Sequence, residues 1–221
     1  MASTGPASRR VTVRRHPERS RYDRDTIEAI LDEGLICHLG VSVDGEAHVI
    51  PTMYARLGDV VYVHGAMANQ VLGALRSGAT ASLVVTHLDG LVMARSAFHH
   101  SMNYRSVVVV GVAVEVTDHE EKVRAMQALL DQVAPGRWDS SRQPNAVEIG
   151  TTVILALGLN EASAKVRTGP PLDDPDDLSL PYWAGVIPLS TVAGEPVDDP
   201  LLASGIPVPA YARGYRRPKA S

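Results

Sequence analysis

The chain has 221 residues, of which 45% are hydrophobic and 21% charged, with a formal net charge of −4. These values are ordinary for one globular domain with tails and argue against a nucleic-acid surface, since basic residues cluster only near the two ends. Cys37 is the only cysteine, so an internal disulfide and an all-cysteine metal site are excluded. No apolar run approaches the roughly 18 residues that span a bilayer, and the N-terminus lacks a secretory core. We therefore expect a cytoplasmic protein without nucleic-acid or membrane partners.

The first predicted element is a helix that follows a basic, loosely ordered arm of residues 1–21. Asp23 or Asp25 is suited to cap its first amides. An apolar face follows at Ile27, Ile30 and Leu31, and Gly34 ends the helix.

A β-hairpin comes next. Residues 35–43 and 46–55 read as strands, and Asp44-Gly45 between them is a strong two-residue turn signal. Pro51 interrupts the second strand, which indicates an edge or a bulge there. Residues 57–59 turn the chain into a strand over 60–64, and a short helix follows over 69–76.

The second half of the chain repeats this alternation. Residues 81–87 and 91–97 flank a second Asp-Gly signal at 89–90, and a long β-branched strand covers 104–116. Asp118 and Glu121 predict the start of a helix that Pro135-Gly136 ends. Residues 151–159 and 163–168 read as further strands.

Strands joined by hairpins, with helices at the edges, predict a mainly β (α+β) fold: a six-stranded antiparallel barrel with peripheral helices. Hairpin connections exclude a parallel doubly wound sheet. We expect the barrel to span residues 22–170. A Pro- and Asp-rich extension over 171–221 would pack on the barrel or on a second copy of the chain.

The junction at His64 carries the most chemical information. A strand ending at His64 runs into Gly65 and then into a helix that begins near Asn69. The free amides of a helix start suit an anion such as a phosphate. The imidazole beside them is a candidate proton donor or haem ligand. The alternative is a packed histidine at a strand end.

Two basic groups leave a similar choice. Arg105 opens a strand of valines and needs either an anionic ligand or an ion pair with Asp89 or Glu115. Lys165 and Arg167 alternate onto one face of a short strand, where they are either solvated or in contact with a ligand.

Metal and nucleophile motifs do not appear. The five histidines between residues 48 and 100 lack a metal-ligand spacing. Acidic pairs at 173–174 and 176–177 lie in a Pro-rich loop and are expected to be solvated.

Taken together, the order of these elements resembles a known family, the pyridoxamine 5'-phosphate oxidase-like flavoproteins with the FMN-binding split-barrel fold. The branch near the nitroimidazole-resistance proteins is the most similar. The resemblance covers roughly residues 20–190. It rests on the stretches His48–Tyr54, Tyr62–Ala66, Thr86–Gly90, Phe98–Val107 and Ser163–Pro170.

This resemblance implies a homodimer with FMN in the groove between the subunits. The second hairpin strand would run under the flavin ring, and the junction after His64 would face its ribityl chain and phosphate. The residues implied in cofactor binding are Ile50, Pro51, Thr52, Met53, His64, Gly65, Asn69, Gln70, Asn103, Tyr104, Arg105, Ser106, Lys165, Arg167 and Trp183.

One departure from the family pattern bears on the cofactor. Relatives place a serine and a basic residue where this chain has Asn69 and Gln70. A neutral amide grips a phosphate less strongly than arginine does, unless Arg105, Lys165 or Arg167 compensates.

Three functions follow from the resemblance. The first is an FMN-dependent oxidoreductase acting on a small organic molecule, with His64 as the catalytic proton donor or substrate-orienting group. The second is a haem-binding enzyme with His64 as the axial iron ligand, which would be the only metal site. The third is a non-catalytic dimer that binds a small molecule.

Overall fold

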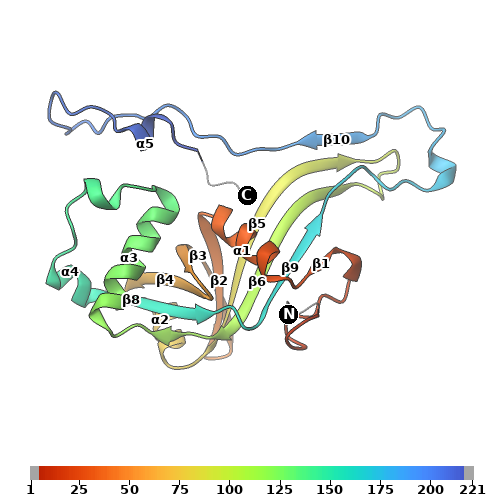
Figure 1. The fold of residues 1–221 in the computed structure, drawn as a ribbon. Helices are drawn as coiled ribbons and strands as arrows, with labels where there is room; N and C mark the ends of the chain where they lie inside the picture. Colours follow the sequence, from red (N-terminus) through yellow and green to blue (C-terminus); the bar gives the residue numbers. More distant parts are fainter. Residues whose placement is uncertain (1–4, 217–221) are drawn as a thin grey trace.

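The computed structural model describes residues 5–216 (Figure 1). Its helices are α1 (Arg24–Glu33), α2 (Gln70–Arg76), α3 (His119–Val133), α4 (Ala146–Thr151) and α5 (Ala210–Arg213), with 3₁₀ turns η1 (Pro17–Arg19), η2 (Trp138–Ser140) and η3 (Pro175–Asp177). Its strands are β1 (Ser20–Arg21), β2 (Ile36–Val43), β3 (Glu46–Leu57), β4 (Val60–Ala66), β5 (Thr80–Met93), β6 (Ser101–Val112), β7 (Val114–Glu115), β8 (Thr152–Gly158), β9 (Ala162–Arg167) and β10 (Gly185–Pro188).

The strands form one antiparallel system in the order β1-β9-β6-β5-β2-β3-β4-β8-β7, and β10 pairs with β5. The strands curve around a core of apolar side chains that includes Leu39, Leu83 and Leu155, which are almost fully buried. The short β8–β9 connection joins the strands next to the two ends of this order, and Val110 N donates to Glu161 O there. The expected antiparallel barrel is confirmed, although its count of six strands was too low.

Local signals in the first hairpin were sufficient to predict it. Asp44 and Gly45 both have positive φ, 52° and 85°, as the tight turn of a two-residue hairpin requires. The turn sets the register that pairs Val43 with Glu46 and Ile36 with Met53. Asp23 and Asn69 cap α1 and α2 by accepting from the amides of Thr26 and Leu72, as the helix signals predicted for α1.

β3 changes partner part-way along its length. Its first part, through Met53, pairs with β2, whereas Tyr54–Leu57 pairs with β4. The segment Glu46–Met53 therefore has no strand on its second edge among the described residues. Pro51, which lacks an N–H, lies in this segment, so the expected edge position is confirmed.

The predicted turn at Asp89-Gly90 was wrong. β5 runs without a break from Thr80 to Met93, and only its register with β6 shifts between Leu88 and Gly90. Two contacts account for this: Asp89 accepts from Arg105 on the neighbouring strand, and Gly90 lies against Ile187 O and Val186 of β10. A Cβ at Gly90 would come within 3.1 Å of both, so the glycine serves a close approach of strands.

The C-terminal end of α1 is held by side chains from three other elements. Its last carbonyls have no partners within the helix. The ring Nε2 of His87 lies 2.9 Å from Ile30 O, the Tyr54 hydroxyl donates to Leu31 O, and Gln132 Nε2 donates to the carbonyls of Leu31, Asp32 and Gly34. These bonds tie α1 to β5, β3 and α3.

The C-terminal part of the chain is extended. After β10 it runs as an extended chain along one side of the molecule to the short helix α5 (Figure 1). It exposes several large apolar side chains, with Val192, Val197 and Leu201 at 80%, 94% and 92% exposure. Among residues 5–216, none of the helices has the length and apolarity that a membrane crossing needs.

We predict that Gly34→Ala destabilises the protein. An added Cβ would overlap the buried Tyr54 hydroxyl and lie 2.8 Å from Val85 Cγ1. Overpacking of this kind costs about 1–3 kcal/mol in unfolding free energy, measurable by urea denaturation. Gly73→Ala, in α2 with open space around it, is the matched control and should stabilise by about 0.5–1 kcal/mol. Equal stability of the two variants would contradict the packing assigned to Gly34.

Candidate functional site

His64 lies near the end of β4, opposite Ile154 of β8. It shares a face of the sheet with Tyr62, which packs against α3 in a small buried cluster. Its Nδ1 atom is buried and has no hydrogen-bond partner among the described residues. Burial lowers the pKa of His64, which keeps the imidazole neutral. A buried, neutral and unpartnered ring nitrogen is uncommon in a fold and marks this position as a candidate ligand.

The residues after His64 have structural roles of their own. Gly65 lies so close to Leu72 that a Cβ would come within 2.6 Å of its side chain, so the glycine allows α2 to pack on β4. The side-chain oxygen of Asn69 caps α2. Gln70 is the first residue of the helix and is exposed. The neutral residues at 69 and 70 thus begin a helix of one to two turns.

The partnerless edge of β3 adjoins an apolar cavity of about 500 Å³. Pro51, Thr52 and Met53 line it from β3. Ile50, the fourth predicted residue of this strand, packs instead against the barrel core. Leu35, Ile36 and Val133 complete the wall. They could not be found from the sequence, because Leu35 and Ile36 lie at the start of the preceding strand and Val133 at the end of α3, all far from Pro51 along the chain.

Arg105 is saturated by two carboxylates. Its Nε and Nη2 each lie 2.9 Å from an oxygen of Asp89, and Nη1 and Nη2 donate to Glu33 of α1 at 2.5 and 3.0 Å. These bonds raise the pKa of Arg105. Of the alternatives open for this residue, the ion pair with Asp89 is the one found, while Glu115 pairs with Arg76. Its predicted contact with a cofactor stays a prediction.

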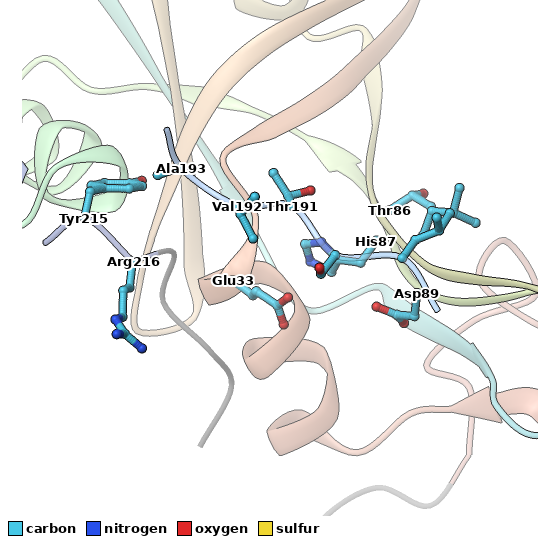
Figure 2. Close-up of a pocket in the computed structure, with 12 residues that line it drawn as sticks. Glu33, Thr86, His87, Asp89, Thr191, Val192, Ala193, Tyr215 and Arg216 are labelled. Atoms are coloured by element: carbon cyan, nitrogen blue, oxygen red, sulfur yellow. The ribbon is translucent and has the colours of Figure 1, made fainter. Parts of the chain in front are cut away.

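A cavity of about 690 Å³ lies next to this ion pair (Figure 2). Glu33 and Asp89 line it from the barrel side, together with His87. The segment Leu189–Ala193 and Tyr215-Arg216 close it from the C-terminal extension. Figure 2 shows Val192 and Thr191 above the α1 end that carries Glu33.

A second polar cavity, of about 560 Å³, collects positive charge. We call it the cationic cleft. Arg15, His16 and Arg19 line it from the N-terminal arm, Phe98–Ser101 from the β5–β6 connection, Lys165 and Arg167 from β9, and Leu172 from the loop that follows. Lys165 and Arg167 therefore share a face, as their spacing predicted.

The neighbours of this cleft on β6 are tied to β9. Asn103 is buried, accepts from Arg167 Nη1 and donates to Gly169 O. Tyr104 pairs with Arg167 and is half-buried. Ser106 Oγ donates to Lys165 O at 3.4 Å.

The acidic loop after β9 was expected to be solvated, but one of its carboxylates is buried. The Asp173 side chain is buried and accepts from the backbone and guanidinium of Arg95. Ligand atoms of His99, Asp173 and Asp177 lie within 4.8 Å of one another, but the Arg95 charge beside Asp173 opposes a cation there. Trp183 is 66% exposed, and its ring packs against Gly185.

Apart from Trp183, which lies just before β10, the predicted site residues thus fall into three places: the β4–α2 junction, β3, and the β6–β9 face. One copy of the chain does not bring these three together. Sequence reasoning missed the arginines and histidine of the N-terminal arm. Their density at the end of the chain was the available signal, but it was read as a solvated arm.

The barrel with a divided strand, flanked by α1 and α3, defines a split-barrel protein. A model of the family described as pyridoxamine 5'-phosphate oxidase matches residues 23–166. The chain belongs to this family. Cys37, its only cysteine, is buried within the barrel, and burial raises the pKa of its thiol to about 12, so it is inert.

Solved structures agree with this assignment. The chain is 40% identical to the flavocytochrome Anf3 from Azotobacter vinelandii, with a TM-score of 0.89 over 93% of this chain and 96% of that one. It is 34% identical to the FAD and haem binding protein from Mycobacterium smegmatis, with a TM-score of 0.85 over 89% and 96%. No curated protein sequence matches significantly.

A more distant structure shares the fold alone. It is described as a 5-nitroimidazole antibiotic resistance protein from Bacteroides thetaiotaomicron and is 17% identical, with a TM-score of 0.57 over 66% of this chain and 86% of that one. The expected relation to the nitroimidazole-resistance proteins therefore holds at the level of the fold.

We predict that His64 makes the cofactor-free protein less stable in mild acid. Its folded pKa lies below the ordinary value near 6.5, so the unfolded chain takes up the proton first. Unfolding free energy should fall as the pH drops below about 6.5 and through the folded pKa. In His64→Gln this loss should be smaller, as measured by urea denaturation at several pH values. His119→Gln, at an exposed position on α3, is the control; an unchanged slope in His64→Gln would refute the assignment.

Proposed function

We propose that the protein is a flavin-dependent oxidoreductase that also holds haem, with His64 as the axial iron ligand. The observation that carries the proposal is similarity at 40% and 34% identity, over nearly the whole chain, to two proteins described as a flavocytochrome and as an FAD and haem binding protein. Flavin and haem, first considered as alternatives, are in this proposal present together.

The free edge of β3 fits a flavin ring. Glu46–Met53 offers backbone N–H and C=O groups on its second edge, and such groups suit the polar edge of an isoalloxazine. Pro51, Thr52 and Met53 present an apolar wall beside it. Apolar cavities with a few polar groups are the usual form of cofactor sites.

His64 fits an iron ligand better than it fits a proton donor. An iron ligand must be a neutral imidazole, which its lowered pKa favours. A proton donor would have to be protonated near neutral pH, which burial disfavours. Iron would bind the other ring nitrogen, Nε2, because the unpartnered Nδ1 is enclosed within the chain.

When bound, flavin and haem supply the electron-transfer chemistry. The chain's own residues would position these cofactors and shield them from water. Pro51 and Met53 would exclude water from one face of a ring bound in the β3 cavity, and the free backbone groups of this strand would orient it. His64 presents its ring from the rigid end of β4, where Gly65 allows α2 to pack closely.

We further propose a homodimer. Exposed apolar side chains on the hairpin, including Ile36 at 58% and Val49 at 64%, leave a surface that a second copy would cover. The separation of the predicted site residues into three places supports the same arrangement, because a second copy supplies the missing groups. The division into an arm, a barrel and a C-terminal extension, and the cytoplasmic location, stay predictions, the latter supported by the single unpaired cysteine.

The cofactor proposal predicts a two-part absorbance spectrum for protein produced with haem available. Flavin bands near about 375 and 450 nm should accompany a Soret band. His64→Ala should lose most of the bound haem and keep its flavin. His99→Ala is the matched control, because His99 is the other histidine with a buried, unpartnered ring nitrogen.

Two results would overturn this assignment. Undiminished haem in purified His64→Ala would remove His64 as the ligand. Protein that takes up neither flavin nor haem would favour the third function, a non-catalytic dimer.

The dimer proposal predicts that Val49→Asp weakens both association and flavin binding. A buried, unpaired carboxylate at an apolar interface costs several kcal/mol, so the dissociation constant should rise at least about 100-fold. Analytical ultracentrifugation and flavin titration measure the two effects. Val147→Asp, on α4 and 71% exposed, is the control. A variant at Val49 that stays dimeric would show that the interface lies elsewhere.

A further inference from the structure

The cationic cleft includes Lys165 and Arg167, which the resemblance implied in cofactor binding, but the contacts proposed above for the flavin ring and the haem lie elsewhere. It lies on the β9 side of the strand order, three strands away from β2 and the hairpin edge. Its walls come from three segments that are far apart in sequence. The cleft is therefore a separate candidate site.

Arg167 is the strongest indication. The residue is only 6% exposed, and its guanidinium donates to Asn103 Oδ1 and to the carbonyls of Gly169 and Pro170. All three acceptors are neutral. Among residues 5–216, no carboxylate forms an ion pair with Arg167, and burial with the nearby Arg19 charge lowers its pKa.

Arg105 differs from Arg167 in its partners. Arg105 is less deeply buried yet has two carboxylate partners, Glu33 and Asp89. A buried cation without a counter-charge costs stability unless an anion completes it. The neutral acceptors around Arg167 hold the guanidinium in position and leave its charge available.

The other charges at the cleft are mostly positive. Arg15 and Lys165 have no ion pair among the described residues, and Lys165 is half-buried. Acids lie on two sides of the rim. Glu18 contacts His16 at 3.1 Å and Arg19 at 3.6 Å, and its side chain is 62% exposed.

The other acids lie beside His99. Asp174 is 3.8 Å away and 74% exposed, and Asp173 and Asp177 have carboxylate oxygens within 4.8 Å of a His99 ring nitrogen, with Asp173 paired to Arg95. Among the described residues, none of these acids forms an ion pair with Lys165 or Arg167, so the inner part of the cleft keeps a positive charge that suits a phosphate.

An aromatic ring stands at the same cleft. Phe98 is the only phenylalanine of the chain, and it is 88% exposed. Its ring meets His99 edge-on at a centroid distance of 5.4 Å. A large exposed aromatic beside a group of cations matches a ligand that carries both a planar ring and a phosphate.

We propose that the cationic cleft binds a nucleoside phosphate, with the phosphate on Arg167 and Lys165 and the base against Phe98. Two sources share this chemistry: the adenylate half of FAD and a separate nucleotide. In the first case the inference rests on the proposed flavin function and selects FAD over FMN. In the second it is independent of that function.

Calorimetric titration of the flavin-free full-length protein with ADP tests the site itself. ADP should bind more tightly than adenosine or inorganic phosphate. Lys165→Gln and Arg167→Gln should each weaken ADP binding by about tenfold or more, because each removes a charged phosphate contact. Phe98→Ala should weaken ADP and leave inorganic phosphate unchanged. Arg142→Gln, at an exposed ion pair with Glu148, is the control.

Lys165 and Phe98 are surface-accessible, so their variants keep the test valid if Arg167→Gln does not fold. Absence of ADP binding, or ADP binding that survives both Lys165→Gln and Phe98→Ala, overturns the proposal. Because these titrations use flavin-free protein, they give a result even if the proposed flavin function fails.

The same variants distinguish the two sources. If the adenylate half of FAD occupies the cleft, FAD-loaded protein should not bind ADP, and Lys165→Gln should weaken FAD but not FMN. If a separate nucleotide binds, FAD-loaded protein should bind ADP, and both flavins should be unaffected by Lys165→Gln.

Discussion

The partner exchange along β3 is the constraint on which the rest of this architecture depends. A single strand of 12 residues pairs first with β2 and then with β4, changing at Met53 and Tyr54. Because one strand belongs to both halves of the barrel, the two halves cannot be flat continuations of each other. The change of partner leaves the outer edge of Glu46–Met53 free, and it places the apolar cavity beside that edge. The proposed flavin site is thus a direct consequence of how the barrel divides.

Buried polar groups explain how the divided barrel holds together. The end of α1 brings orphan carbonyls into the interior, and Tyr54 and Gln132 satisfy them. Arg105 joins α1 to β5 through Glu33 and Asp89. In these cases the buried donors and acceptors have partners, and the bonds between them stabilise the fold. His64 and Arg167 differ, because within residues 5–216 His64 Nδ1 has no hydrogen-bond partner and Arg167 has no acidic counter-charge. The proposed phosphate would supply the counter-charge that Arg167 lacks.

Much of the fold was predictable because its signals are local. The caps at Asp23 and Asp118 and the turn at Asp44-Gly45 depend on residues within a few positions of each other. The error at Asp89-Gly90 has the opposite cause. The same dipeptide makes a turn at 44–45 and a continuous strand at 89–90, since Arg105 and β10 contact it from elsewhere in the sequence. The strand count was low in part for the same reason: of the four strands beyond the predicted six, three (β1, β7 and β10) are short strands that depend on their partners.

The sequence by itself determined that the barrel is antiparallel, that His64 lies near a strand end and that Lys165 and Arg167 share a face. Each follows from strand periodicity or from motifs within one segment. Only the tertiary structure decided which charges are compensated. Arg105 and Arg167 both lie on strands and read alike in the sequence, but one is neutralised by acids from α1 and β5, whereas the other is enclosed by neutral carbonyls. Compensation depends on distances between segments far apart in the chain, and these are set only when the barrel closes.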